Sequence, residues 1–418
     1  MEGESNDATV PAPRSTRASA YDLFTSGSAT NGVVEELRKC GFKGQVQVIS
    51  RETQQPFDRT KLSKALMADL SKVAWRFPDF YQKAGIEMIQ DEATSVDFSS
   101  KTVSTKSGKT YDYTKLVIAP GGHPKSLPLP GLKEGELENV FILRSLVHTQ
   151  AINAALGDSS KKVVVIGSSF IGMEVANCIA GMEAKHDVTI VGMDKVPTEA
   201  IFGEQLGKTF QALLEKNGVK FKMGASVESA KPRDGSKKVG SLELKDGTSL
   251  EADLIIEGVG VGPATEFVKE SKGGPSLEKD GSIKVDEHFQ VPSLPGVYAI
   301  GDVATYPYKG QDVRIEHWNV AQNAGRQVAR DITGKPVKVF TPVFWSALGS
   351  QLRYCGNTSL GYDDIVIKGD LTVSKDKMPS FAAFFCKGEE VNAVATMQMD
   401  PVVSVASFRE SRNNTNAP

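Results

Sequence analysis

The stretch VVVIGSSFIGMEVANCIAG, Val163 to Gly181, decides how this chain folds. Its apolar start predicts a short buried strand, and the residues after the glycine turn predict a helix. The turn GSSFIG, Gly167 to Gly172, has the spacing of a dinucleotide-binding fingerprint with Ser169 at the middle position. The first glycine allows a tight turn, a small middle residue lets backbone amides approach a diphosphate, and the last glycine permits close helix–strand packing. We therefore predict a Rossmann-like dinucleotide site, the alternative being an ordinary strand–helix turn.

A second turn of this kind lies near the start of the chain, in TSGSATNGVVEELRKCGF. Gly27, Ala29 and Gly32 repeat the spacing, again with the middle glycine replaced. The strand YDLFTS before it is short and only half apolar. The next strand, QVQVIS, leads to Glu52, about 20 residues beyond the turn, where an acid would hold adenosine ribose hydroxyls. Two such units in one chain predict two dinucleotides.

The composition limits the classes of function. The chain has 418 residues, enough for two or three domains, and 49 basic against 51 acidic residues give a net charge of -2. This near neutrality argues against a nucleic-acid partner, and no apolar run approaches the roughly 20 residues that span a bilayer. The polar residues 1–19 lack the apolar run of a signal peptide, so we expect a disordered tail. We expect a cytoplasmic monomer or homodimer, with mitochondrial association as the alternative location.

The four cysteines lie far apart in the sequence. No pair among Cys40, Cys178, Cys355 and Cys386 has the spacing of a redox-active disulfide or of a metal site. We therefore expect reduced thiols and no resident metal.

Five stretches carry a resemblance to a known family. In chain order they are PFDRTKLSKAL, GSSFIGMEVAN, GVYAIGDVATYP, IEHWNVAQNAGR and FWSALGSQLRYCG. From about Tyr21 to Ser411 the chain resembles the FAD-dependent pyridine nucleotide-disulfide oxidoreductase superfamily. Within it, the chain is similar to the apoptosis-inducing-factor-like oxidoreductases and oxygenase-type ferredoxin reductases, which bind two dinucleotides.

The resemblance implies an α/β fold with two Rossmann-like dinucleotide-binding domains, for FAD and NADH, and a C-terminal α+β interface domain. Strand–helix alternation over the first two-thirds of the chain agrees with this, as do the antiparallel-looking strands near the end. The expected FAD domain comprises residues 20–150 and 273–335, separated by an NAD(P)H domain at 151–272. The C-terminal domain is expected at 336–418.

The resemblance also implies an FAD site built from several segments. Lys64 would lie near flavin N5 and stabilise the reduced ring, and Asp302 would bind the ribityl chain. Glu316 and Trp318, and later Phe344 and Trp345, would form walls of the flavin pocket, with core packing as the alternative for the tryptophans. The implied catalytic residues are Lys64, Glu316 and Trp318. The implied FAD contacts are Gly27, Gly32, Glu52, Arg59, Lys64, Ala93, Gly121, Asp302, Trp318 and Trp345.

The glycine turn from Gly167 to Gly172 would hold the nicotinamide nucleotide. The implied contacts are Gly167, Ser169, Gly172, Glu174, Asp194 and Gly260. In the strand VTIVGMD, Gly192 stands where an acid is expected, and Asp194 follows two places later. Because no arginine is present there to hold a 2′-phosphate, we favour NADH, with NADPH as the alternative.

Together these features predict a reductase that takes hydride from NAD(P)H onto flavin N5. Its electrons would pass to a quinone, a small oxidant or an iron–sulphur partner. This branch often carries its own iron–sulphur domain, but no Cys/His ligand spacing is present, so we expect any such centre in a partner protein. The alternatives are a slow-turnover flavoprotein of apoptosis-inducing-factor type, whose NADH binding controls assembly with a partner, and a cofactor-poor remnant.

Overall fold

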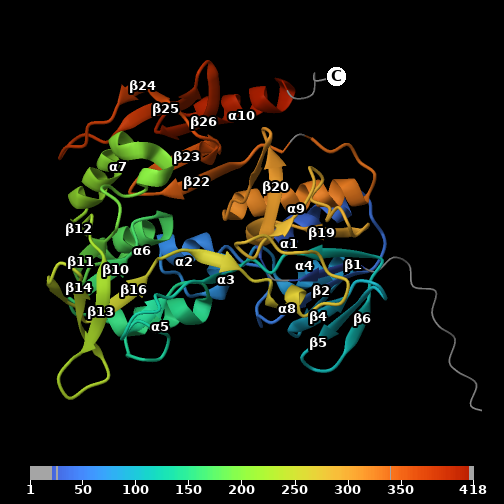
Figure 1. Ribbon diagram of the computed structural model, residues 1–418, viewed down its shortest axis with the longest axis horizontal. Coiled ribbons are helices and arrows are strands. Elements are labelled where there is room, and N and C mark those ends of the chain that lie inside the picture. Colours follow the sequence, from blue (N-terminus) through green and yellow to red (C-terminus); the bar gives the residue numbers. More distant parts are fainter. Residues whose placement is uncertain (1–20, 25–26, 339, 414–418) are drawn as a thin grey trace, which may run out of the picture.

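The computed structural model describes residues 21–24, 27–338 and 340–413 (Figure 1). Two parallel sheets, each with its own helices, lie side by side, and an antiparallel sheet with a helix covers one end of the pair. We call these the first, second and C-terminal units. This arrangement confirms the predicted α/β class and the C-terminal α+β unit. The expected tail at 1–19 lies outside the described residues.

The first unit is built on a five-stranded parallel sheet in the order β19-β7-β1-β2-β3. Its strand β2 is buried along its whole length, as expected when helices cover both faces of a parallel sheet. The expected strand YDLF is present as β1, at the centre of this sheet. The strands are β1 (Tyr21–Phe24), β2 (Val46–Ser50), β3 (Ile86–Gln90), β7 (Lys115–Ile118) and β19 (Val297–Ala299).

The second unit has a parallel sheet in the order β12-β11-β10-β16-β9. Strand β9 pairs with β16, so it belongs to this sheet although it precedes the expected boundary at residue 151. That boundary also cuts helix α5 (Leu146–Leu156). The strands are β9 (Val140–Ile142), β10 (Lys162–Ile166), β11 (Asp187–Val191), β12 (Lys220–Lys222) and β16 (Leu254–Glu257). Helices α6 (Phe170–Ala180) and α7 (Glu199–Lys216) follow β10 and β11.

Helices α1 (Ser28–Lys39) and α9 (Trp318–Ile332) pack closely although they are far apart in the sequence. A Cβ atom on Gly32 would lie 2.2 Å from the carbonyl oxygen of Gln322, and one on Gly325 would lie 2.3 Å from that of Ala29. Each helix therefore needs a glycine at the crossing. Gly32, expected to contact FAD, is a packing residue that sets the distance between these helices.

Short elements connect the large sheets. Between β2 and β3 the chain forms three short helices, because Leu66 has a positive φ of 43° and Pro78 starts a new helix. These are α2 (Thr60–Lys64), α3 (Leu70–Val73) and α4 (Pro78–Lys83). Helix α8 (Glu266–Lys269) and the turn η1 (Gly301–Val303) are also short. Antiparallel sheets are formed by β4 (Ala93–Asp97), β5 (Thr102–Thr105) and β6 (Thr110–Asp112), and by β13 (Val227–Pro232), β14 (Val239–Leu244) and β15 (Ser249–Glu251).

Two further small sheets complete the connections. Strand β8 (Gly122–Pro124) lies where the chain leaves the first unit for the second, and β17 (Val261–Pro263) lies where it returns. The two strands pair with each other. The other sheet contains β18 (Ile283–Lys284), β20 (Ala304–Tyr308) and β21 (Gln311–Val313).

The C-terminal unit is an antiparallel sheet in the order β22-β23-β26-β25-β24, with helix α10 (Val402–Asn413) packed on it. It shares a hydrophobic core with the second unit, where Phe202 of α7 meets Tyr354 with ring centroids 5.5 Å apart. The strands are β22 (Val343–Ala347), β23 (Gln351–Gly356), β24 (Asp364–Asp370), β25 (Ser380–Lys387) and β26 (Glu390–Met397), and a short turn η2 (Thr358–Leu360) follows β23.

The crossing of α1 and α9 can be tested by adding one methyl group. Gly32→Ala should lower the free energy of unfolding by about 1–3 kcal/mol, because the new Cβ forces two backbones apart. Gly181→Ala is the matched control, since a Cβ there has its nearest neighbours at an ordinary 3.5 Å. Chemical denaturation of both variants measures the difference. Equal stability of the two variants would contradict the packing role of Gly32.

Candidate functional site

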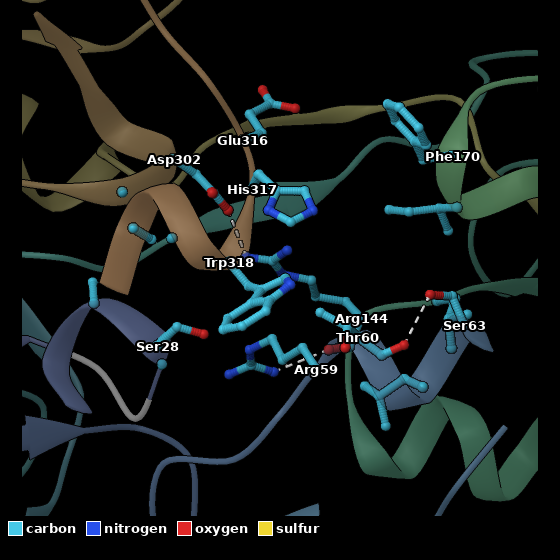
Figure 2. A pocket seen from close by; sticks show the side chains of 18 of the residues that line it. Ser28, Arg59, Thr60, Ser63, Arg144, Phe170, Asp302, Glu316, His317 and Trp318 are labelled. Carbon is cyan, nitrogen blue, oxygen red and sulfur yellow. Dashed lines mark hydrogen bonds and ion pairs between the residues drawn. The ribbon is translucent and has the colours of Figure 1, made fainter. Parts of the chain in front are cut away.

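Two adjoining pockets form one elongated cleft at the carboxyl ends of the strands of the first sheet. They share Arg59, Pro120 and Arg144, so these residues mark the middle of the cleft. Figure 2 shows Arg59 and Arg144 in one of the two pockets. One end reaches Lys64, Glu174 and Trp318, and the other reaches Glu52, Ala93 and Phe267. A long cleft with chemically different ends suits an extended dinucleotide.

Two guanidinium groups, those of Arg59 and Arg144, lie at the middle of the cleft. Arg59 Nη1 donates to the carbonyl oxygen of Arg144 at 3.0 Å, and Arg144 Nη2 lies 2.8 Å from Asp302 Oδ2. Gly27, at the start of α1, lines the same region. Two guanidinium groups beside a helix N-terminus form a site for a diphosphate, because both favour negative charge.

Arg144 is a site residue that the sequence reasoning missed. It follows β9 and directly precedes Ser145, whose side chain caps α5 by accepting from the His148 amide at 3.2 Å. The Arg144 amide donates to His148 Nδ1 at 3.2 Å, which fixes the backbone there. In the sequence, the feature that could have indicated Arg144 is its place in VFILRSL, directly before the serine that caps a helix. Asp302, expected to bind the ribityl chain, lines the cleft and forms an ion pair with Arg144.

The far end of the cleft matches the adenosine half of a dinucleotide. Glu52 follows β2 and forms an ion pair with Arg59, and Ser50 and Ala93 also line this end. Gly121 turns the chain at φ 71°, and a Cβ on it would lie 2.9 Å from Arg144 Nη2. These positions bring together the expected residues Glu52, Arg59, Ala93 and Gly121.

The near end of the cleft is organised around a buried carboxylate, that of Glu174. This residue of α6 is 4% exposed, and its Oε1 lies 2.8 Å from Lys64 Nζ. Ser63 donates to Oε2 at 2.5 Å, and Ser346 donates to Oε1 at 2.5 Å. Glu174, expected as an NAD contact, therefore joins α2 of the first unit, α6 of the second and β22 of the C-terminal unit.

Local sequence explains how Lys64 reaches this place. In DRTKLSK, the Asp58 carboxylate accepts from the Thr60 amide at 3.0 Å and from its hydroxyl at 2.7 Å. These bonds start the short helix α2, which carries Ser63 and Lys64 toward α6. Lys64 Nζ also lies 5.2 Å from the ring centroid of Trp345, a cation–π contact.

Trp318 lines the near end of the cleft, and Trp345 lies beside it without lining either pocket, so its contact with FAD stays a prediction. Trp318 begins α9, and its ring lies 6.2 Å from that of Trp345 and 5.6 Å from that of Trp75. The indole Nε1 of Trp318 is buried and has no hydrogen-bond partner in the described part of the chain. A buried donor is normally paired, so this unpaired N–H is an exception within the described residues. Glu316 also lines the cleft and forms an ion pair with Arg314.

His317 is a second residue that the sequence reasoning missed, although it lies between two expected ones. Its Nδ1 accepts from the Asn319 amide at 3.3 Å, so the proton is on Nε2, which donates to the Trp345 carbonyl oxygen at 3.1 Å. Burial and the nearby charge of Lys64 lower the pKa of His317 to about 3. The imidazole is therefore neutral, and its ring stacks on Phe344 at 4.4 Å.

The glycine turn of the second unit directly adjoins this cleft. Gly167 has φ 109°, and a Cβ on Gly172 would lie 2.0 Å from the Gly167 carbonyl oxygen, so helix α6 approaches β10 as closely as predicted. Ser169 precedes the helix, and Phe170 and Ile171 from its first turn line the cleft (Figure 2). A nucleotide on this turn would thus meet a ligand in the cleft.

Two expected NAD contacts lie farther from the cleft. Gly260, in the loop between β16 and β17, has φ 98° and open space at its Cβ position. Asp194 is exposed in the loop after β11. Both stay predictions as nucleotide contacts.

The residues of the cleft fit FAD. An acid lies at the adenosine end, two arginines lie in the middle, and an unpaired indole N–H and a lysine lie at the opposite end. The cleft and the neighbouring glycine turn together define a class of fold with places for two dinucleotides. The chain belongs to the family described as pyridine nucleotide-disulphide oxidoreductase, whose sequence profile matches residues 26–325. This family uses FAD and NAD(H), with NADPH also found.

Known relatives agree with this assignment. The chain is 35% identical over 401 residues to apoptosis-inducing factor 3 of Mus musculus, covering 94% of this chain and 63% of that protein. It thus spans less than two thirds of that relative. Monodehydroascorbate reductase 3 of Arabidopsis thaliana is 29% identical over 399 residues, 90% of this chain and 88% of that one. The reductase in the covalent putidaredoxin reductase–putidaredoxin complex superposes with a TM-score of 0.86 at 28% identity, over 95% of this chain and 94% of that one.

Two other observations bear on the class. All four cysteines are free. Within the described residues, no helix is both long and apolar enough to cross a membrane.

The Glu174 ion pair can be tested by removing one charge. Glu174→Gln should lower the free energy of unfolding by about 3–5 kcal/mol, because the buried Lys64 ammonium loses its counter-charge. Adding Lys64→Met should restore part of that loss, since the two substitutions affect one interaction. Glu204→Gln, in the exposed pair of Glu204 with Lys208, is the control and should leave stability nearly unchanged. Strictly additive effects of the two buried substitutions would contradict the coupling.

Proposed function

We propose that this chain is an NAD(P)H-dependent FAD oxidoreductase that needs no redox-active disulfide. The observation that carries the proposal is the position of α6. Its N-terminal turn forms the glycine-rich nucleotide site, while Phe170, Ile171 and Glu174 of the same helix line the cleft for FAD. One helix thus places the two nucleotides against each other, and such orientation is the protein's main contribution to hydride transfer.

The side chains at the near end of the cleft have separate tasks. Bound FAD would accept a hydride from NAD(P)H and release electrons to an acceptor. The Lys64 ammonium supplies positive charge at this end, and Glu174 fixes its direction through the ion pair. His317, neutral and held at both nitrogens, cannot take up a proton at neutral pH, so it shapes the wall without changing its charge.

We propose an iron–sulphur protein as the electron acceptor. Support comes from the putidaredoxin complex, in which a reductase of similar fold is bound to its partner. A quinone and a small oxidant remain alternatives, and the similarity to monodehydroascorbate reductase 3 is the observation that favours a small oxidant. The cytoplasmic location, and the mitochondrial alternative, stay predictions.

The direct test is the colour of the purified chain. We expect a yellow protein. Its absorbance from oxidised flavin, at about 450 nm, should be lost when NADH or NADPH is added in the absence of oxygen. A protein that stays colourless after reconstitution with FAD would overturn the proposal. A yellow protein that bleaches only over minutes, about the scale of slow conformational steps, would instead favour the slow-turnover alternative of apoptosis-inducing-factor type.

The two nucleotide sites should be separable by one substitution. Gly172→Val should push α6 away from β10, since even a Cβ would lie 2.0 Å from the Gly167 carbonyl oxygen. The variant should keep FAD, resist bleaching by NAD(P)H and still be reduced by dithionite. Gly181→Val, at the exposed end of the same helix, is the matched control and should bleach normally. Stopped-flow absorbance at several nucleotide concentrations measures this, and equal loss of FAD and nucleotide binding in Gly172→Val would contradict separate sites.

A further inference from the structure

The second nucleotide site lacks the acid that usually selects NADH. In Rossmann units this acid ends the second strand and binds the ribose 2′-hydroxyl, which also repels a 2′-phosphate. Here Gly192 directly follows β11, and it is buried. A Cβ on Gly192 would lie 2.6 Å from Ser168 Oγ and 2.9 Å from Ser168 Cβ. Met223 Cε also lies 2.9 Å from that position, so the side chains of Ser168 and Met223 together fill the space that an acid would need.

Neither residue can easily make room. The Gly192 amide donates to the Lys222 carbonyl oxygen at 3.1 Å, and its own carbonyl oxygen accepts from the Ala225 amide at 2.9 Å. Ser168 is 7% exposed, and its carbonyl oxygen accepts from the Thr198 amide at 3.1 Å. These backbone hydrogen bonds hold Gly192 and Ser168 in place, so the two residues cannot easily move apart.

The other groups around position 192 carry little net charge with which to distinguish a ribose 2′-hydroxyl from a 2′-phosphate. Met193 is 79% exposed, which leaves an apolar side chain free to contact an adenine ring. Asp194 and Lys195 follow, both exposed and opposite in sign. The Ser168 hydroxyl can accept from a ribose hydroxyl or donate to a phosphate oxygen, because a hydroxyl is both donor and acceptor.

We propose that Ser168 determines nucleotide specificity and that the site accepts NADPH about as readily as NADH. This inference rests on the proposed function, because it concerns the nucleotide site of that reductase. It differs from the expectation of an NADH preference, which rested on the lack of an arginine to hold a 2′-phosphate. Uncharged contacts from Ser168 and Met193 hold the adenosine half, so the 2′-phosphate meets no fixed carboxylate at the end of β11.

The test uses two probes that contain only the adenosine half, ADP-ribose and its 2′-phosphate. Isothermal titration of the FAD-loaded protein should give dissociation constants within about tenfold of each other, or about 1.4 kcal/mol. A preference for ADP-ribose well beyond about tenfold would overturn the inference while leaving the proposed function intact. Failure of both probes to bind would overturn the nucleotide site itself and, with it, the proposed function.

Three variants test the role of Ser168 itself. Ser168→Gly with Gly192→Asp removes the Ser168 contacts and leaves only the flexible end of the Met223 side chain to move aside. It should shift the ratio of the two dissociation constants by about tenfold toward ADP-ribose. Ser168→Ala with Gly192→Asp is the matched control, which retains the Cβ that lies 2.9 Å away and should not gain this preference. Asp194→Asn should leave the wild-type ratio unchanged.

Other outcomes would contradict the proposal. Equal shifts in the two double variants would show that the Ser168 side chain does not restrict position 192. A relative gain of about tenfold for the 2′-phosphate probe in Asp194→Asn would show that Asp194 is the ribose acid. Thermal unfolding of each variant identifies those that do not fold, and the wild-type ratio and Asp194→Asn then still decide the question.

Discussion

The buried carboxylate of Glu174 is the constraint on which the site depends. A charge that is 4% exposed is costly unless it is fully compensated, and its three partners come from two other units of the fold. Lys64 and Ser63 lie on α2, and Ser346 lies on β22. The interaction is therefore complete only when all three units are docked, and it is then that Lys64 lies in the cleft.

Glycines fix the distances that bring these units together. Gly32 and Gly325 allow α1 and α9 to touch through their backbones, and Gly172 allows the same between α6 and the turn before it. Because α9 starts with Trp318 and α6 carries Glu174, these crossings help to place two of the side chains that line the cleft. The fingerprint glycines thus position the site as much as they leave room for a ligand.

The middle of the cleft is balanced before any ligand enters. Arg59 and Arg144 are paired with Glu52 and Asp302, which compensates their charge and holds them in place. A diphosphate can join these guanidinium groups with little rearrangement, since they are already oriented. The same principle holds for His317, whose two hydrogen bonds fix its ring while burial and the charge of Lys64 keep it neutral.

Local patterns in the sequence were sufficient for the two parallel units, the glycine turns and several residues of the cleft, because strand–turn–helix signals and short motifs depend on near neighbours in the chain. Sequence could not reveal that Gly32 packs against Gln322 or that Glu174 binds Lys64, since these partners lie in distant segments. Arg144 and His317 escaped notice because their roles arise from partners in other elements. The exclusion of an acid at Gly192 likewise became visible only when the fold placed Ser168 against it, because steric room is a property of tertiary packing.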